Sequence, residues 1–525
     1  MNCLGALILS TVLLPGPGSG NGPACDPFEA VNLVPRDVTL YLHAREAASI
    51  RANLAQRPVK DLFQRLLKTG ELSQAWHRLA LSARLEDEAL FDLWLGRSFT
   101  LVTRREGETS DWALLTEVDT EQARQVLRRL NPRRLTPRFA LPISELPEHE
   151  LLLAADGSTY LIGPKAPGRL FEELLAALAG AAEPVASLVG HPAMEKARAL
   201  GGGEVGIFTR HDPPLGGFSV IVADLDGERI MLHHAGLFDS PPFQRPVTRM
   251  EWDPAPLEAF EDEAMLAFIE PTDIGGGPVE IFIEAVLDVP LLSAEMRRNI
   301  GCRRMFVVGE VEGRQEPHKT DLLLPTLSIV MEVKDPQRAE LELDEQASRF
   351  AEAVNRLSEG AAQAAIPPID SFRPGEARHI DLGPVMEPFS ERHPILQSVT
   401  LDWAVAGALS GSYAVIATHP DQLQQTVKAL EGQREGAGRV GKWTSCGTLN
   451  GPRIGRHLRS YSDQAPLLAE ADEKAVAEFR ETLLLLSELA GGIDRCRWQL
   501  YRPTEKEMRL EAQITLTRPE SAGGR

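Results

Sequence analysis

The chain is poor in cysteine, in aromatic residues and in long apolar runs. It has 5 cysteines in 525 residues, and no two of them have the Cys-x-x-Cys spacing. This argues against a zinc site or a redox dithiol built from neighbouring cysteines. Aromatic residues make up 6% of the chain, so its cores must consist mainly of Leu, Val, Ile and Ala. After residue 24 no apolar run approaches the ~18 residues of a membrane-spanning helix, and we expect no transmembrane segment in the mature chain.

Positive charge is also scarce, because 55 Lys and Arg stand against 75 Asp and Glu, which gives a formal net charge of −20. A field of this sign repels phosphate backbones and anionic lipid headgroups, so we expect neither a nucleic-acid partner nor a membrane-surface partner. One segment is an exception and contains Arg128, Arg129, Arg133, Arg134 and Arg138. Two interpretations are open: a local anion-binding patch, or a helix end whose dipole favours cations, followed by a solvated loop.

The N-terminal segment has the pattern of a targeting signal. Residues 4–14 form an uncharged apolar run, and Pro and Gly dominate residues 15–20. As a helix the run would span ~16 Å, too short for a ~30 Å hydrocarbon core but suited to a secretory signal. No Lys or Arg precedes it. We predict that residues 1–24 are a signal peptide and that the protein is exported, to the periplasm or the extracellular space; a disordered cytosolic leader is the alternative.

Cys25 would follow such a cleavage site directly, as the lipidated cysteine of a lipoprotein does. The preceding triplet Gly22-Pro23-Ala24 lacks the usual Leu, so we do not expect lipid anchoring at Cys25. Cys302, Cys446 and Cys496 would also remain in the mature chain. An oxidising compartment allows one or two disulfides, with Cys446–Cys496 the pair nearer in sequence, and buried unpaired cysteines are the equal alternative.

The order of predicted elements indicates an internal repeat. Four kinds of element recur: a strand after an acidic or Pro turn, a strand leading into a helix, a strand followed by a Pro-containing loop and a helix, and a hairpin. They lie at 37–43, 113–130, 158–178 and 218–233, and again at 262–268, 327–341, 412–430 and 496–514. Four pairs in the same order favour a duplication.

This pattern predicts an α+β fold of two related halves, each a mainly antiparallel sheet with packed helices. The halves are expected at residues 25–245 and 257–525, with a Pro-rich junction at 246–256. A helix at about 471–489 is expected to be the longest of the chain.

The chain resembles a family of large, uncharacterised exported bacterial proteins, a domain-of-unknown-function family. The resemblance lies in Pro35-Arg-Asp37 leading to Tyr41, and in the units at Tyr160 and Tyr413, each a tyrosine in an apolar strand followed by Pro and a helix. It covers most of the mature chain. It implies compartment and architecture only, because these motifs contain no known catalytic residue.

Three glycine-rich segments invite a nucleotide-binding interpretation. Residues 436–442 have the Gly-x4-Gly-Lys spacing of a phosphate-binding loop. Trp443 follows where a magnesium-binding Ser or Thr is needed, and a predicted helix rather than a strand precedes, so we interpret the segment as a flexible loop. The triplets 201–203 and 275–277 are interpreted as turns at which Gly ends a helix or loop.

The histidines form no metal-binding pattern in the sequence. His233 and His234 are adjacent in a predicted strand, so their side chains point to opposite faces and cannot chelate one metal. The other histidines that we considered are scattered, at His43, His191, His211, His379 and His393. We therefore expect no metal site.

Nucleophile motifs are equally weak. Ser410 lies in Gly407-Ala-Leu-Ser410-Gly411, which has the wrong spacing for a nucleophile elbow, and is assigned to a hairpin turn. Cys446 is a candidate thiol near Lys442, but no histidine is close in sequence. We therefore assign no catalytic, cofactor-binding or metal-binding residue and expect no cofactor.

The sequence thus favours a non-enzymatic exported protein that binds a protein or polymer of the cell envelope. Two alternatives stay open: a carboxylate-dependent hydrolase acting on an envelope or extracellular polymer, and a self-associating structural protein. A pair of carboxylates or an apolar patch leaves no local signature, so the sequence does not decide among them.

Overall fold

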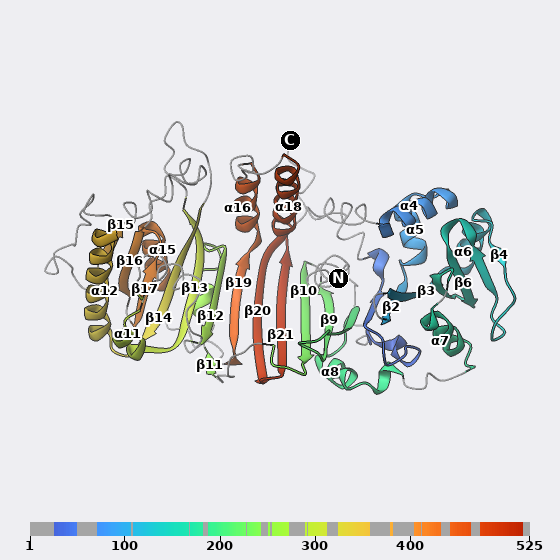
Figure 1. Cartoon of the computed structure of the whole chain (residues 1–525), viewed down its shortest axis with the longest axis horizontal. Helices are drawn as coiled ribbons and strands as arrows, with labels where there is room; N and C mark the ends of the chain where they lie inside the picture. Colours follow the sequence, from blue (N-terminus) through green and yellow to red (C-terminus); the bar gives the residue numbers. More distant parts are fainter. Residues whose placement is uncertain are drawn as a thin grey trace. The chain divides into compact units, whose positions relative to one another are not determined.

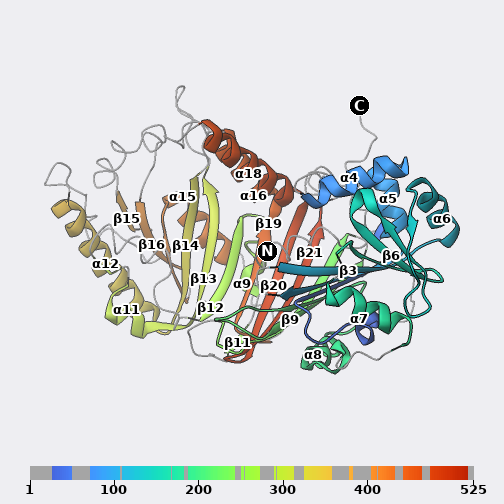
Figure 2. The ribbon, with the colours of Figure 1, turned by 45° about the vertical axis from the view of Figure 1, so that its right-hand side comes forward.

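The computed structural model describes residues 26–49, 71–106, 109–166, 168–181, 187–226, 228–242, 250–252, 255–271, 289–290, 292–311, 324–357, 378–381, 404–410, 412–431, 441–463 and 473–517. The chain divides into two compact units, residues 1–246 with 502–525 (unit 1) and residues 247–501 (unit 2). In each unit helices pack on an antiparallel sheet (Figures 1 and 2), which confirms the predicted α+β class. The predicted signal peptide and Cys25 lie outside the described residues.

The sheet of unit 1 is antiparallel throughout. Its strands follow the order β4 (Arg133–Arg134), β5 (Ile143–Leu146), β6 (Leu151–Asp156), β7 (Thr159–Pro164), β3 (Thr109–Glu117), β2 (Ser98–Glu106), β1 (Leu40–Arg45), β8 (Val205–Arg210), β9 (Phe218–Asp226), β10 (Arg229–Leu237) and β21 (Glu507–Leu516).

Both faces of this sheet are covered by helices. On β7, Leu161 belongs to one buried cluster, whereas its neighbours Tyr160 and Ile162 belong to another, because successive strand residues point to opposite faces. The Leu161 cluster includes α7 (Arg169–Leu178) and α8 (Pro192–Leu200). The other includes α4 (Glu71–Ala83), α5 (Asp87–Trp94) and α6 (Thr120–Arg129), and Asp119 caps α6 by accepting the N–H groups of residues 121 and 122.

The sheet of unit 2 is also antiparallel. Its order is β15 (Arg378–Asp381), β16 (Ala404–Ser410), β17 (Tyr413–Ala417), β14 (Leu324–Val333), β13 (Ile300–Val311), β12 (Leu266–Pro271), β19 (Ser445–Asn450) and β20 (Ile493–Thr504). A separate pair joins β11 (Met250–Trp252) to β18 (Gly441–Trp443).

Helices cover both faces here too. On β14, Ile329 packs with α11 (Ala294–Asn299) and α12 (Pro336–Leu357), and Val330 packs with α9 (Ala255–Glu258) and α15 (Pro420–Glu431). Beyond β19, α16 (Gly451–Asp463) packs closely on α18 (Glu473–Gly491), because a Cβ at Gly455 would lie 2.8 Å from the carbonyl oxygen of Ser487.

The two units share one order of strands. Unit 1 contains β6–β7–β3–β2–β1–β8–β9, and unit 2 contains β16–β17–β14–β13–β12–β19–β20, with the members met in the same succession along the chain. A duplication would produce this shared order, and common descent of the halves stays a prediction.

Two expectations differ from the structure. The last strand does not belong with the second half, because β21 pairs with β10 from Arg229↔Thr515 to Leu237↔Glu507 and so belongs to unit 1. Strand pairing across hundreds of residues leaves no trace in local pattern. The longest described helix is α12, with 22 residues, rather than α18, with 19. No helix in the described part of the chain is both long and apolar enough to span a bilayer.

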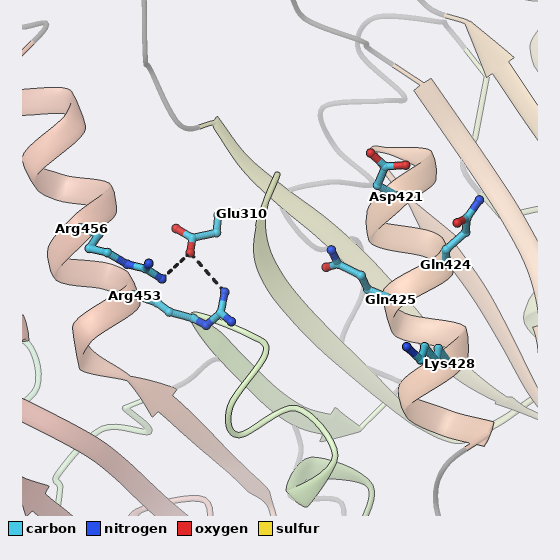
Figure 3. A pocket seen from close by; sticks show the side chains of 7 residues that line it. All are labelled: Glu310, Asp421, Gln424, Gln425, Lys428, Arg453 and Arg456. Atoms are coloured by element: carbon cyan, nitrogen blue, oxygen red, sulfur yellow. Dashed lines mark hydrogen bonds and ion pairs between the residues drawn. The ribbon is translucent and has the colours of Figure 1, made fainter. Parts of the chain in front are cut away.

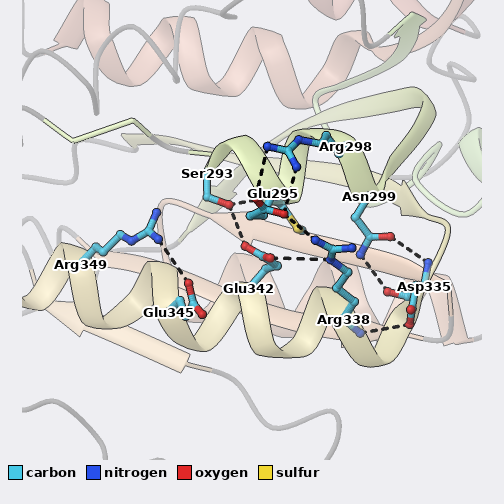
Figure 4. Close-up of polar contacts among 10 residues, drawn as sticks. Ser293, Glu295, Arg298, Asn299, Asp335, Arg338, Glu342, Glu345 and Arg349 are labelled. Carbon is cyan, nitrogen blue, oxygen red and sulfur yellow. Dashed lines mark hydrogen bonds and ion pairs between the residues drawn. The ribbon is translucent and has the colours of Figure 1, made fainter.

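A polar cluster joins α11 to α12 (Figure 4). Ser293 accepts the N–H of Met296 at 2.9 Å, capping α11, and donates to Glu342 Oε2 at 2.8 Å. Asn299 donates to the carbonyl oxygen of Asp335 and accepts its N–H, each at 2.9 Å. Ion pairs among Glu295, Arg298, Arg338 and Glu342 complete the cluster. These groups satisfy one another, so the cluster is structural.

Substituting Ser293→Ala is therefore expected to destabilise unit 2 by about 2 kcal/mol, because the helix cap and the partner of a buried carboxylate are lost together. Urea unfolding, with hydrogen exchange of α11 and α12, measures the effect. Ser348→Ala is the matched control on α12, since that hydroxyl bonds only within its own helix, to the carbonyl oxygen of Asp344. Equal stability of the two variants would contradict the role of Ser293.

Candidate functional site

Unit 2 contains a polar cavity of about 620 Å³ between α15, α16 and the end of β13 (Figure 3). Ligand cavities in proteins commonly have volumes of about 300–1,000 Å³. The lining is polar throughout and consists of Glu310, Asp421, Gln424, Gln425, Lys428, Arg453 and Arg456.

One wall of the cavity is a single face of α15. The wall residues have the spacing i, i+3, i+4, i+7, which places them on one side of the helix. Leu423 and Leu430 point to the other side and are buried in the core of unit 2. The helix is therefore anchored by its apolar face and presents its polar face to the cavity. That face carries Asp421, Gln424, Gln425 and Lys428.

The opposite wall is the first part of α16. Asn450 Oδ1 accepts the N–H of Arg453 at 3.2 Å, and Arg453 Nε donates to the carbonyl oxygen of Asp262 at 2.8 Å. These contacts hold the Arg453 side chain in place. Arg456 lies on the same face of α16, and its side chain is 64% exposed. The exposed guanidinium group of Arg456, which a ligand can reach, thus lies beside that of Arg453, which hydrogen bonds within the protein already orient.

Glu310, from β13, lies between the two arginines. Its side chain is 8% exposed, and its Oε1 accepts from Arg453 Nη1 at 3.1 Å and from Arg456 Nη2 at 2.9 Å. Its Oε2 is buried and has no hydrogen-bond partner among the described residues. Leaving a buried acceptor unsatisfied costs roughly 1–3 kcal/mol. Because Oε2 is buried, a ligand in the cavity meets the guanidinium groups that Oε1 holds rather than Oε2 itself.

The charges of the lining favour an anion. Three cationic side chains stand against two carboxylates, and one of these carboxylates is shared by two guanidinium groups. Lys428 is exposed and makes no ion pair with any described residue. None of the seven lining residues is Ser, Thr, Cys, His or Tyr. The arrangement can therefore hold an anionic group and hydrogen-bond to its neighbours, and the lining contains none of those nucleophiles.

No motif in the sequence marks this cavity. Its residues come from three segments: Glu310 on β13, four residues of α15 more than a hundred residues later, and two arginines on α16. None of them belongs to a motif. The only local signal is the one-sided polar spacing on the predicted helix 421–430, which is common to solvent-exposed helices.

A second polar group, in unit 1, brings together His211 and His234, which are apart in the sequence. Ser219 Oγ lies 2.7 Å from His211 Nε2 and 3.0 Å from His234 Nε2. The contact between His234 and Ser219 follows from the hairpin of β9 and β10, in which His234 lies opposite Ile221, two residues from Ser219. Ser219 is 4% exposed, so a substrate cannot reach its hydroxyl.

The remaining histidines are separate. His43 is buried, and its Nδ1 lies 2.8 Å from Thr100 Oγ1. His191 caps α8 by accepting the N–H of Ala193 at 3.1 Å. His379 lies in β15, and His393 falls outside the described residues. Within the described ranges no three His, Cys, Asp or Glu side chains are grouped as metal ligands.

Several segments that the sequence raised as motifs have other roles. Gly441 and Lys442, the end of the Gly-x4-Gly-Lys pattern, lie in β18, where Lys442 pairs with Glu251. The pattern therefore leads into a strand rather than the helix that a phosphate-binding loop requires. Residues 436–440 and 275–277 lie outside the described part. Gly201 ends α8 with a φ of 96°, which confirms the predicted turn. Ser410 ends β16 and pairs with Tyr413 at a hairpin end.

The cysteine pair that the sequence allowed is not joined. Cys446 and Cys496 are both thiols, and Cys496 lies opposite Leu449 while Cys446 lies opposite Gln499. Burial raises the pKa of Cys496 to about 11, which disfavours its thiolate. Cys446 is buried in the core of unit 2, so it is not an accessible nucleophile.

The arginine-rich segment lies on the surface of unit 1. Arg128 and Arg129 occupy the last turn of α6, as the dipole interpretation requires. Arg133 and Arg134 form β4, beyond the helix, and Arg138 is ion-paired with Glu172. The dipole interpretation therefore accounts for the first two arginines only.

Comparisons with known proteins give little. No family model and no curated protein matches the chain. Solved structures titled crystal forms I, III and IV of TP0453 are similar to part of it, with TM-scores of 0.26, 0.27 and 0.26 and identities of 12%, 9% and 10%. They cover 42%, 55% and 54% of this chain and 82%, 93% and 91% of their own. Similarity at this level carries no inference about function.

The pair of histidines predicts a pH dependence of stability. Burial, together with a smaller effect of the neighbouring His211, lowers the pKa of His234 from 6.5 to about 4. Since the unfolded chain binds this proton more readily, the stabilisation is present above pH 6.5 and is lost as the pH falls toward 4. For His234 alone the loss between pH 7.5 and pH 5 is about 2 kcal/mol.

Replacing His234→Gln removes the titrating group and keeps a polar side chain, so the variant should lose less stability than the parent over that interval. Thermal unfolding at a series of pH values measures this. His233→Gln, on the opposite face of the same strand, is the control and should follow the parent. Parallel curves for the parent and His234→Gln would show that His234 does not titrate on unfolding.

Proposed function

We propose that this chain is an exported, non-enzymatic binding protein whose unit 2 holds a small polar ligand with one anionic group and several hydroxyl groups, such as an acidic sugar. The carrying observation is Glu310, whose buried Oε2 has no hydrogen-bond partner among the described residues while its Oε1 orients Arg453 and Arg456 at the cavity wall.

The chemistry of the ligand follows from the walls. Arg456 and Lys428 are the exposed cations and would meet a carboxylate or phosphate, since guanidinium and ammonium groups are suited to these anions. Asp421 and the side-chain amides of Gln424 and Gln425 on α15 would accept hydrogen bonds from hydroxyl groups or donate to them. A wholly polar lining disfavours an apolar ligand, because burying these groups without partners is costly.

Export is supported by the sequence pattern of residues 1–24 alone. Acidic sugars occur as free molecules and as units of anionic polymers, so the ligand is compatible with the predicted envelope polymer. The hydrolase and the self-associating structural protein stay as alternatives. A hydrolase would place Glu310 and Asp421, on opposite walls in Figure 3, on either side of a scissile bond.

Glucuronate is therefore expected to bind unit 2, and glucose, which lacks the anionic group, much more weakly. Arg456→Gln and Lys428→Gln should each weaken binding of glucuronate by about tenfold or more, the effect of losing one hydrogen bond to a charged group. Isothermal titration calorimetry on the whole chain measures both.

The matched control is Arg459→Gln, on the same helix but outside the cavity lining, which should leave the affinity unchanged. Equal affinity for glucose and glucuronate would contradict the anion requirement. Release of sugar from a glucuronate-containing polymer, abolished in Asp421→Asn, would favour the hydrolase instead.

Mass spectrometry of the protein from its own host is expected to show a chain that lacks about 20–24 N-terminal residues, because a secretory signal is removed on export. A mass that includes residue 1 would contradict export. Additional mass of a diacylglycerol on Cys25 would show the anchoring that the triplet before it does not favour.

A further inference from the structure

A cationic surface on unit 1 goes beyond the proposed ligand cavity. Between residues 122 and 144 the chain has 6 arginines and no Asp or Glu, in a protein of net charge −20. The segment runs from α6 through the hairpin of β4 and β5. We call the exposed residues Arg128, Arg133, Arg134 and Phe139 the arginine hairpin; Arg133 and Arg134 are consecutive on β4, the edge strand, so their side chains project on opposite sides of that edge.

The tip of the hairpin is a tight two-residue turn. Leu141 donates its N–H to the carbonyl oxygen of Arg138 at 2.9 Å, and Arg138 donates back to Leu141 at 3.3 Å. The two residues between them, Phe139 and Ala140, have φ angles of 50° and 64°. Such turns normally use Gly, Asn or Asp at these positions, because other side chains are strained there.

The turn nevertheless presents an aromatic side chain to solvent, since Phe139 is 48% exposed. The fold does not require this ring for its core, and glycine would adopt the turn with less strain. An exposed aromatic residue in a strained turn is more readily explained by contact with a partner than by stability.

Arg138, beside the tip, is paired with Glu172, but three other cations of the segment are not compensated. Arg128, Arg133 and Arg134 are exposed and make no ion pair with any residue that the structure describes. The nearest carboxylate across the hairpin, Glu145 opposite Arg133, is buried and paired with Lys165 at 2.9 Å. These three arginines therefore carry unpaired positive charge on unit 1, although the net charge of the chain is −20.

We propose that the arginine hairpin docks the protein on an anionic lipid surface, with Phe139 in the interfacial layer and Arg128, Arg133 and Arg134 on lipid phosphates. Apolar rings such as that of phenylalanine insert at the boundary of headgroups and acyl chains, and each nearby arginine strengthens binding to anionic lipid.

Structural roles account for part of this surface. Arginines on β4 discourage pairing at the edge of the sheet, and Arg128 suits the helix dipole. Neither role needs an exposed phenylalanine at a positive φ. A soluble anionic polymer is the competing partner, and it would use the cations without inserting the ring.

The test is co-sedimentation with vesicles of phosphatidylcholine, alone or with about 30 mol% phosphatidylglycerol, at low salt. All variants carry the same N-terminal residues, so any contribution of residues 1–24 to vesicle binding is the same in each and cancels when the variants are compared. We expect at least tenfold stronger partition into the anionic vesicles, reduced at about 0.5 M salt, and about a fivefold loss for each of Arg133→Gln and Arg134→Gln.

Phe139→Gly is the decisive variant. Glycine suits the positive φ, so the melting temperature should stay equal or rise while vesicle binding falls about fivefold. Phe479→Ser, at the exposed phenylalanine on α18, is the control and should bind like the parent.

Three results would overturn the proposal: no preference for anionic vesicles at low salt, unchanged binding of Phe139→Gly, or a fall in its melting temperature that shows a structural role for the ring. Loss of vesicle binding in competition with polyglucuronate, with the polymer bound equally by the parent and Phe139→Gly, would assign the surface to a soluble polymer instead. The cavity of unit 2 takes no part in the vesicle measurements. In the polymer competition, Lys428→Gln, which weakens binding in the cavity, separates polymer held at the hairpin from polymer held in the cavity.

Discussion

Each unit depends on a sheet whose two faces are both buried. Alternate residues of one strand enter different cores, as Ile329 and Val330 do on β14. A shift of one residue would exchange the cores, so the register is strongly specified. Helices must then cover each face, and this requirement puts α15 where its polar side can form a cavity wall.

The cavity shows how a stabilising framework creates a chemical site. α15 is anchored through Leu423 and Leu430, and Arg453 is anchored to the carbonyl oxygen of Asp262. With both walls held, Glu310 can accept two guanidinium groups through one oxygen and leave the other without a partner. Burial makes that vacant acceptor significant, because an exposed one would be satisfied by water.

Local patterns predicted many of the elements well. The predicted strand-to-helix junction is confirmed: β3 is followed by Asp119, which caps the start of α6. Such a junction can be predicted because helix capping depends on a few neighbouring residues. The hairpin of β9 and β10 followed from alternation and its turn. The predictions failed where distant pairing decides, as with β21, which joins unit 1 through β10. The candidate site was missed for the same reason, because Glu310, Lys428 and Arg456 meet only in three dimensions.

The sequence by itself determined the class of fold, the order of the elements, the scarcity of cysteine and the arginine-rich exception to an acidic chain, because composition and short-range periodicity carry this information. Only the tertiary structure decided which arginines are exposed and unpaired, that Phe139 occupies a strained turn, and that one oxygen of Glu310 is buried without a partner. Exposure and pairing depend on neighbours from distant segments, and a linear pattern does not contain them.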